Sequence, residues 1–306
     1  MVRYIVRRLL QMIPVALGTI FIIYAMVYSL GDPAQGRCGE RPCSAAYIAK
    51  FNAEYNLDKP LLVQYVLYLG KLVHGDLGTN FFGNQVSQEL LTRYPLTIKL
   101  TVIAILFELI VGIAAGVLAG IRKNGFIDNL VLVSTLVVIS IPVFVIGALA
   151  QLVFGVKLAI FPVTASEGTL QQLILPGLVL GALSVAYVAR LTRTSLVENL
   201  RSDYVRTARA KGLSSARTVG VHTLRNSLIP VITYIGADVG ALMGGAIVTE
   251  RIFNVNGVGF FIWRSINQQD GQSVVGAVTV LVLIFLLVNL IVDILYGVLD
   301  PRISND

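Results

Sequence analysis

The sequence predicts an all-α membrane protein that crosses the bilayer six times. Of its 306 residues, 56% are hydrophobic and only 13% are charged, whereas a soluble domain carries about a quarter charged residues. Long apolar runs recur along the chain, and most reach the ~20 residues that a helix needs to cross the hydrocarbon core. The six runs are 9–30, 100–121, 129–154, 173–189, 228–249 and 274–299.

The first run is expected to remain in the mature protein as an anchor. Arg3, Arg7 and Arg8 precede it, as basic residues precede the apolar core of a secretory signal peptide. This run is longer than such a core, however, and the Gly31-Asp32-Pro33 sequence that follows offers no small-residue cleavage site. We therefore expect a retained signal anchor.

The distribution of Lys and Arg predicts that both termini lie in the cytoplasm. With the N-terminus inside, the cytoplasm receives the arginines before the first run, the Arg122-Lys123 pair and the basic residues between positions 190 and 225. Short loops decide the orientation, because long loops contribute little to the positive-inside rule. The net charge of +7 is thus explained by topology, and no nucleic-acid partner is expected.

The long first loop is predicted to lie outside and to be helical. Ser44 can cap a helix in which aromatic and aliphatic residues recur at helical spacing, and Pro60 opens a second amphipathic stretch. We expect two short helices on or near the outer membrane surface. On this basis we divide the chain into an anchor with its loop, residues 1–99, and a membrane core, residues 100–306.

Two cysteines lie close together in this loop. Cys38 and Cys43 fall in an oxidising compartment under the predicted topology, which favours a small disulfide over two free thiols. The only histidines, His74 and His222, fall on opposite sides of the membrane. We therefore expect no metal site.

A basic segment between the fourth and fifth runs, at about 196–227, carries helix signals on the cytoplasmic side. Asp203 can cap a short helix, and Gly212 can end it in a left-handed conformation. Ser214 or Ser215 can start the next helix. Ala208 keeps the first helix slim enough to enter a groove on another protein. Two alternatives remain open: the positive charge could hold the topology, or it could bind anionic lipids.

Glycines repeat every four residues in two of the runs, a pattern that lets membrane helices approach closely. We expect these residues to pack helices, with a lining of the permeation pathway as the alternative. The glycines are Gly112, Gly116 and Gly120 in the second run and Gly236, Gly240 and Gly244 in the fifth.

Three acidic residues lie within or near the runs. A charged side chain at a helix centre costs roughly 2.5–3.5 kcal/mol on insertion scales, so none should face lipid. We expect Glu108 to face another helix and Asp293 to be structural. Asp238 is expected to face the central pathway, where it could meet the amino terminus of a peptide, or to face a neighbouring helix.

Several motifs resemble those of ATP-binding-cassette (ABC) importer permeases. They are RTARAKG at 206–212, HTLRNSLIP at 222–230, HGDLG at 74–78, SIPVFVIG at 140–147, GGAIVTERIFNVNGVG at 244–259 and LLVNLIVDILYGVLDPR at 286–302. The generic family loop begins Glu-Ala-Ala, and a glycine follows six positions after the glutamate. Here Arg206 and Thr207 replace the first two residues, whereas Ala208 and Gly212 match. In these departures the loop resembles that of the dipeptide/oligopeptide/nickel branch of the family. The motifs taken together resemble the first membrane subunit of that branch.

The resemblance implies a type I importer permease fold in a bacterial inner membrane. This chain would form half of the pathway, beside a homologous second permease, two ABC ATPase subunits and an extracytoplasmic substrate-binding protein. The short helix would couple the chain to an ATPase. The residues implied in coupling are Asp203, Tyr204, Arg206, Thr207, Ala208, Arg209, Ala210, Lys211 and Gly212.

The chain is not expected to be an enzyme or to bind a cofactor. It lacks the G-x-x-x-x-G-K-[ST] phosphate loop, so ATP and Mg²⁺ are expected on the partner ATPases. Di- and oligopeptides are the leading cargo, with nickel, glutathione or haem as alternatives within the same architecture. An ion-coupled secondary transporter and an intramembrane aspartyl protease using Asp238 and Asp293 are the rival functions. Co-purification of an ATPase would discriminate among them.

Overall fold

The computed structural model describes residues 2–30 and 43–299, and in this part of the chain almost all regular structure is helical. Four helices are long and apolar enough to cross a membrane singly, and two bent helix pairs raise the number of spans to six. The predicted all-α fold with six spans is therefore confirmed when each bent pair counts as one span. The single β-bridge among these residues joins Thr79 to Gln85.

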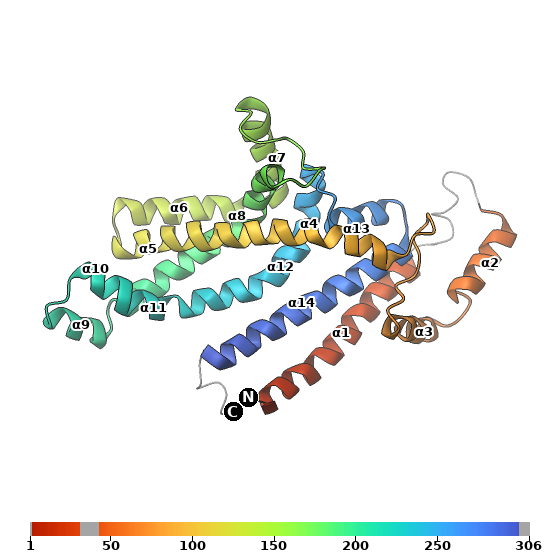
Figure 1. Ribbon diagram of the computed structural model, residues 1–306, viewed down its shortest axis with the longest axis horizontal. Helices are drawn as coiled ribbons and strands as arrows, with labels where there is room; N and C mark the ends of the chain where they lie inside the picture. Colours follow the sequence, from red (N-terminus) through yellow and green to blue (C-terminus); the bar gives the residue numbers. More distant parts are fainter. Residues whose placement is uncertain (1, 31–42, 300–306) are drawn as a thin grey trace.

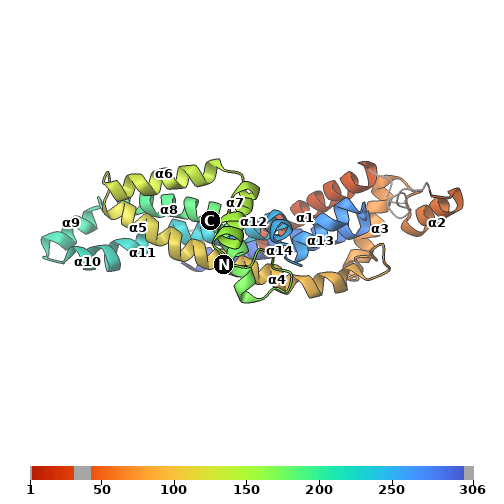
Figure 2. The same cartoon turned by 90° about the horizontal axis from the view of Figure 1, so that it is seen from above.

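The elements form an elongated bundle whose two ends differ (Figures 1 and 2). Helices α9–α11 gather at one end, which the distribution of Lys and Arg predicts to be cytoplasmic, and α2, α3 and α13 gather at the other, the predicted external end. Helix α8, Leu170–Asn199, runs through the middle. It packs against the second span, α6 (Phe126–Ser140) and α12 (Ile229–Phe253), while α1 (Val2–Leu30) packs against α14 (Gly271–Leu299).

The second span begins well before the predicted position 100. Helix α4 covers Val86–Phe107 and continues through a π-turn, Glu108–Gly112, into α5, Ile113–Ile121. Within this extension Glu89 and Arg93 form an i,i+4 ion pair at 2.9 Å, an arrangement that favours helix. The division that we placed at residue 99 falls inside this continuous helix.

The third span is broken, which corrects the prediction of one straight helix over 129–154. Helix α6 and the following α7, Val143–Ala150, are bent by 103°. Pro142 lies at the break, and it holds the preceding Ile141 in an extended conformation. Helix α7 and the π-turn after it, Gln151–Lys157, consequently stand out from the bundle (Figure 1).

The two predicted helices of the external loop are confirmed. Helix α2 covers Ala45–Tyr55, and the Ser44 hydroxyl accepts a hydrogen bond from the backbone N–H of Tyr47 at 3.3 Å. Helix α3 covers Leu61–Val73 and follows Pro60. Cys38 lies outside the described residues, so the disulfide that we expect with Cys43 remains a prediction.

Helix α3 is fastened to both flanking membrane helices by tyrosines. The hydroxyl of Tyr65 donates to the backbone carbonyl of Leu17 in α1 at 2.7 Å. The hydroxyl of Tyr68 donates to Thr279 Oγ1 in α14 at 2.9 Å. Burial raises the pKa of Tyr68 to about 12, so this phenol stays a donor at neutral pH.

The glycine stripe of the second span lies against α8. A Cβ added to Gly112, Gly116 or Gly120 would run into Val188, Ala189 with Thr192, or Leu196. Only a glycine stripe permits the two backbones to approach this closely.

The glycine stripe of α12 is only partly packed in this way. Gly236 approaches Val292, and Gly240 approaches Phe285, both in α14. Gly244 has open space around it, which differs from the packing that we expected there.

Two ion pairs join helices that are distant in sequence. The Arg193 guanidinium in α8 donates two hydrogen bonds to Asp128 in α6, at 3.0 and 2.7 Å. Arg8 in α1 pairs with Asp293 in α14 at 3.3 Å. The second pair gives Asp293 the helix-joining position that we expected for a structural residue.

Candidate functional site

The cytoplasmic end carries a short, exposed helix at the predicted position. Helix α9 covers Asp203–Ala210 and occupies the tip of the bundle (Figure 1). Ser202, and not the predicted Asp203, is the N-cap residue, and its side chain makes no capping hydrogen bond. Asp203 instead lies in the first turn, where its carboxylate favours the positive end of the helix dipole.

The end of α9 has the geometry that the glycine signal predicts. Gly212 has a φ of +78°, in the left-handed region that favours glycine. Its backbone N–H donates to the carbonyl of Arg209 at 2.9 Å, and that of Leu213 donates to Ala208 at 3.2 Å. The Ser214 hydroxyl then accepts from the N–H of Arg217 and caps α10, Ser215–Arg217.

One face of α9 is anchored to the protein. Val205 is fully buried and Ala208 nearly so, and both belong to a helix that packs against the π-turn Thr218–Thr223. The Tyr204 hydroxyl donates to Asn199 Oδ1 at 2.9 Å, at the cytoplasmic end of α8. Helix α9 is therefore in contact with both the end of α8 and the segment that leads into α12.

The other face of α9 is open and largely basic. The exposed residues of α9 and its C-cap are Asp203, Tyr204, Arg206, Thr207, Arg209, Ala210 and Lys211. Arg206 and Asp203 pair at 3.3 Å, but both are too exposed for the pair to contribute much. The structure thus brings all the residues predicted for coupling together, with Val205 and Ala208 as the anchor and the charged residues facing outward.

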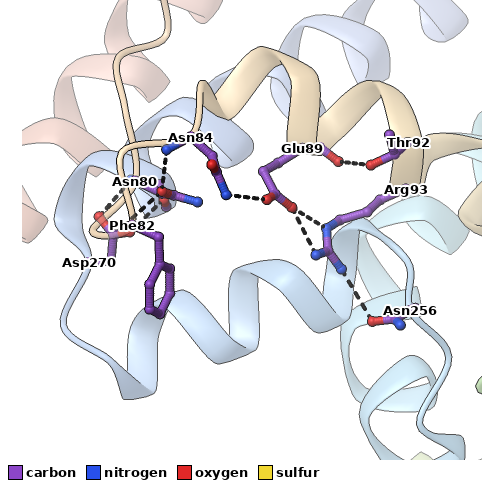
Figure 3. A network of polar contacts seen from close by, with 9 residues as sticks. Asn80, Phe82, Asn84, Glu89, Thr92, Arg93, Asn256 and Asp270 are labelled. Carbon is purple, nitrogen blue, oxygen red and sulfur yellow. Dashed lines mark hydrogen bonds and ion pairs between the residues drawn. The ribbon is translucent and has the colours of Figure 1, made fainter.

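The external end carries a polar network that was not predicted from the sequence (Figure 3). The Asn80 side chain accepts from the backbone N–H groups of Phe82 and Asn84, each at 2.9 Å. Asp270 accepts from the N–H of Phe81 at 3.0 Å. These bonds tie the loop before α4 to the turn before α14. The Asp and Asn residues of this Gly-rich loop are the signal that was available.

A second part of the network joins α4 to the turn after α12. Arg93 donates to Glu89 and, at 3.3 Å, to Asn256 Oδ1 (Figure 3). Its guanidinium also lies 5.1 Å from the ring centre of Phe261 in α13, Val258–Asn267.

Helix α13 begins on a buried carboxylate. Glu250 is fully buried, and it accepts from the N–H of Phe260 at 2.8 Å and from Thr97 Oγ1 at 2.6 Å. A Cβ at Gly257 or Gly259 would collide with this carboxylate. The glycines on either side of Val258 were the sequence signal for such a site, because they let the backbone approach an anion.

Inside the bundle, Glu108 and Asp238 face one another from the second and fifth spans. Glu108 is fully buried, and among the described residues its carboxyl group has no polar partner other than the carboxyl group of Asp238. Asp238 is half-buried. Glu108 thus faces another helix, as expected. The described residues hold no group of three or more potential metal ligands.

Comparison with known proteins gives matches over nearly the whole chain. Residues 112–305 match the family model described as binding-protein-dependent transport system inner membrane component. Residues 1–101 match the model for the N-terminal part of such membrane components. The ten residues between the two matched regions, 102–111, lie in α4 and in the π-turn that follows it.

Three relatives align over almost their full length. The dipeptide transport system permease protein DppB of Alkalihalophilus pseudofirmus is 36% identical, over 99% of this chain and 100% of the relative. The di/tripeptide transport system permease protein DppB of Pseudomonas aeruginosa is 37% identical, over 100% and 99%. The glutathione transport system permease protein GsiC of Pectobacterium atrosepticum is 38% identical, over 99% of each chain.

Proposed function

Because the chain belongs to the family of binding-protein-dependent transport system inner membrane components, we propose that it forms half of the membrane pathway of an ATP-driven importer of di- and oligopeptides. The observation that carries this proposal is the end-to-end match to permeases named for dipeptides, di/tripeptides and glutathione. Glutathione is itself a small peptide, so these names share one cargo chemistry. They favour peptides over nickel or haem.

The partners follow from the family at a general level, and we propose their specific arrangement. A homologous permease completes the pathway, an ATPase pair binds at the cytoplasmic end, and a substrate-binding protein docks at the external end. Helix α9 is the contact with one ATPase subunit. Its buried anchor at Val205, its basic outer face and its place at the cytoplasmic tip support this assignment.

The proposed mechanism is alternating access driven from outside this chain. ATP and Mg²⁺ bind to the partner ATPases, whose closure supplies the energy. This chain contributes α9, which receives the displacement, and α8, which is tied to α9 through Tyr204 and Asn199. Tilting α8 relative to α12 switches the pathway between its two openings, as a rigid element with two arrangements can do.

The test is to reconstitute the complete complex in lipid vesicles with its binding protein. ATP hydrolysis and uptake are measured with di- to tetrapeptides, glutathione, nickel and haem, each at the same concentration. We expect only peptides, including glutathione, to stimulate both activities. Stimulation by nickel or haem alone would overturn the cargo and leave the permease architecture intact. Uptake driven by an ion gradient without ATP would overturn the importer class.

A further inference from the structure

A band of polar and aromatic side chains runs across α8 and α12 inside the membrane. Asp238 and Tyr234 lie in α12, and the rings of Tyr234 and Tyr187 are 6.0 Å apart. Arg190, one turn further along α8, places its guanidinium 5.4 Å from the ring centre of Tyr187. The band therefore begins at a carboxylate, crosses two phenols and ends at a guanidinium.

The band is open on one side. Tyr187 is 45% exposed, and Tyr234, Asp238 and Arg190 are each half-buried. Asp238 lies nine residues along α12, or ~13 Å from its cytoplasmic start at 1.5 Å per residue. Exposing the charged side chains of Asp238 and Arg190 to lipid at such a depth is costly. This surface therefore faces a polar lumen or the second permease.

The acidic end of the band lacks a positive partner. Glu108 lies behind Asp238 and is fully buried, and the Asp238 carboxyl group is the only polar partner of its carboxyl group among the described residues. Among the described residues no lysine or arginine forms an ion pair with either acid. Two facing carboxyl groups in a medium of low dielectric constant attract a positive charge, either a proton or a cationic ligand. The π-turn that starts at Glu108 is a further irregularity of a kind often found at functional sites.

We propose that this band is a peptide-binding site in the pathway, an inference that rests on the proposed function. Asp238, backed by Glu108, takes the α-ammonium group. The faces of Tyr234 and Tyr187 contact the peptide between its charged ends, since aromatic rings accept both cations and apolar groups. Arg190 takes the α-carboxylate. A short peptide carries these two opposite charges at its ends, in the order in which the band presents them.

The test uses the purified complex without its binding protein, so that the selectivity measured is that of the membrane subunits. A radiolabelled tetrapeptide is bound at equilibrium, in the nucleotide-free and vanadate-trapped states, and is displaced by unlabelled tetrapeptide, its N-acetyl derivative or its C-terminal amide. In the unmodified complex we expect each derivative to compete at least tenfold more weakly than the unlabelled, unmodified peptide. In Asp238→Asn the N-acetyl derivative should compete as well as the unmodified peptide. In Arg190→Gln the C-terminal amide should compete as well as the unmodified peptide.

Asp293→Asn is the matched control, because Asp293 is also a membrane acid but pairs with Arg8 away from the band. It should retain both preferences. Unchanged preferences in Asp238→Asn and Arg190→Gln, or no saturable binding to the unmodified complex in either state, would overturn the site. Failure of the proposed function is distinguishable, since it would abolish peptide stimulation of the complete complex with its binding protein. If Asp238→Asn does not assemble, Arg190→Gln carries the test: it should lose the discrimination against the C-terminal amide and keep that against the N-acetyl derivative, and an unchanged discrimination against the amide would overturn the site.

Discussion

Thr97 and Glu250 are 153 positions apart in the chain, and a 2.6 Å hydrogen bond joins their side chains. The Thr97 hydroxyl donates to Glu250 Oε1, and its oxygen accepts from the backbone N–H of Val258 at 2.9 Å. The other oxygen of Glu250 accepts from the N–H of Phe260. Three elements, α4, α12 and α13, are thus closed into one unit at the external end.

Removing the Glu250 carboxylate should destabilise this unit. Glu250→Ala leaves the N–H of Phe260 and the hydroxyl of Thr97 without their acceptor, and each such group costs about 1–3 kcal/mol when buried. Glu250→Gln keeps one acceptor oxygen and should lose less. Thermal unfolding of the assembled complex in detergent measures the difference. We expect the wild type to have the highest melting temperature, Glu250→Gln a lower one and Glu250→Ala the lowest. Equal melting temperatures for Ala and wild type would contradict this account.

Gly212→Val should uncouple transport from ATP hydrolysis. No atom lies within 4 Å of the position that a Cβ at Gly212 would occupy, so the cost of a side chain there comes from its φ of +78°. A left-handed conformation costs a non-glycine residue about 1–2 kcal/mol, and β-branched residues tolerate it least. The measurement is the number of peptides imported per ATP hydrolysed.

Gly212→Asn is the control for this change, because asparagine adopts the left-handed conformation readily. We expect a near-normal number of peptides imported per ATP in Gly212→Asn and a clearly lower number in Gly212→Val. Full transport and ATPase binding in Gly212→Val would count against a coupling role for α9.

Reversing the charge on the open face of α9 should weaken ATPase binding. The double variant Arg206→Glu with Arg209→Glu leaves the buried anchor untouched, since both side chains are exposed. We expect at least tenfold less ATPase retained on affinity-purified permease. The matched control is Arg122→Glu with Lys123→Glu in the other short cytoplasmic loop. Equal losses in the two double variants would indicate a general effect of cytoplasmic charge.

Gly116→Val should loosen the packing of the second span on α8. Its Cβ would lie 2.5 Å from both the Ala189 carbonyl oxygen and the Thr192 Cβ, and backbone has to move to relieve the contact. Overpacking of this kind costs about 1–3 kcal/mol. We expect a lower melting temperature than for Gly18→Val, where nothing lies within 4 Å. The two variants add the same side chain to a membrane helix and differ only in its surroundings.

The sequence predicted those features that depend on local residues. The helices of the external loop follow from Ser44 and Pro60, and the end of α9 follows from Gly212, because caps and left-handed turns are chosen by nearby side chains. The cap of α9 was assigned one residue late, since Ser202 and Asp203 are both good N-cap residues. The long apolar runs predicted the six-span architecture, and the family motifs, which run along most of the chain, predicted the type I importer permease fold.

Features that depend on distant partners were not predictable. Hydropathy does not reveal whether neighbouring helices will repair the backbone at Pro142, so the break of the third span was missed. Glu250 was not singled out, because its partners Thr97 and Phe260 become neighbours only in the folded chain. The pairing of Asp128 with Arg193 has the same origin.

Helix α8 can also be considered as a mechanical lever. Its 30 residues give a rod ~45 Å long at 1.5 Å per residue. The cytoplasmic end of the rod is tied to α9, and the Tyr187–Arg190 segment lies about a third of the length away from that end. A tilt of about 10° would sweep one end of such a rod by roughly 8 Å relative to the other. A small rotation of α8 can therefore produce a stroke at the tip that is large on the scale of a single amino acid.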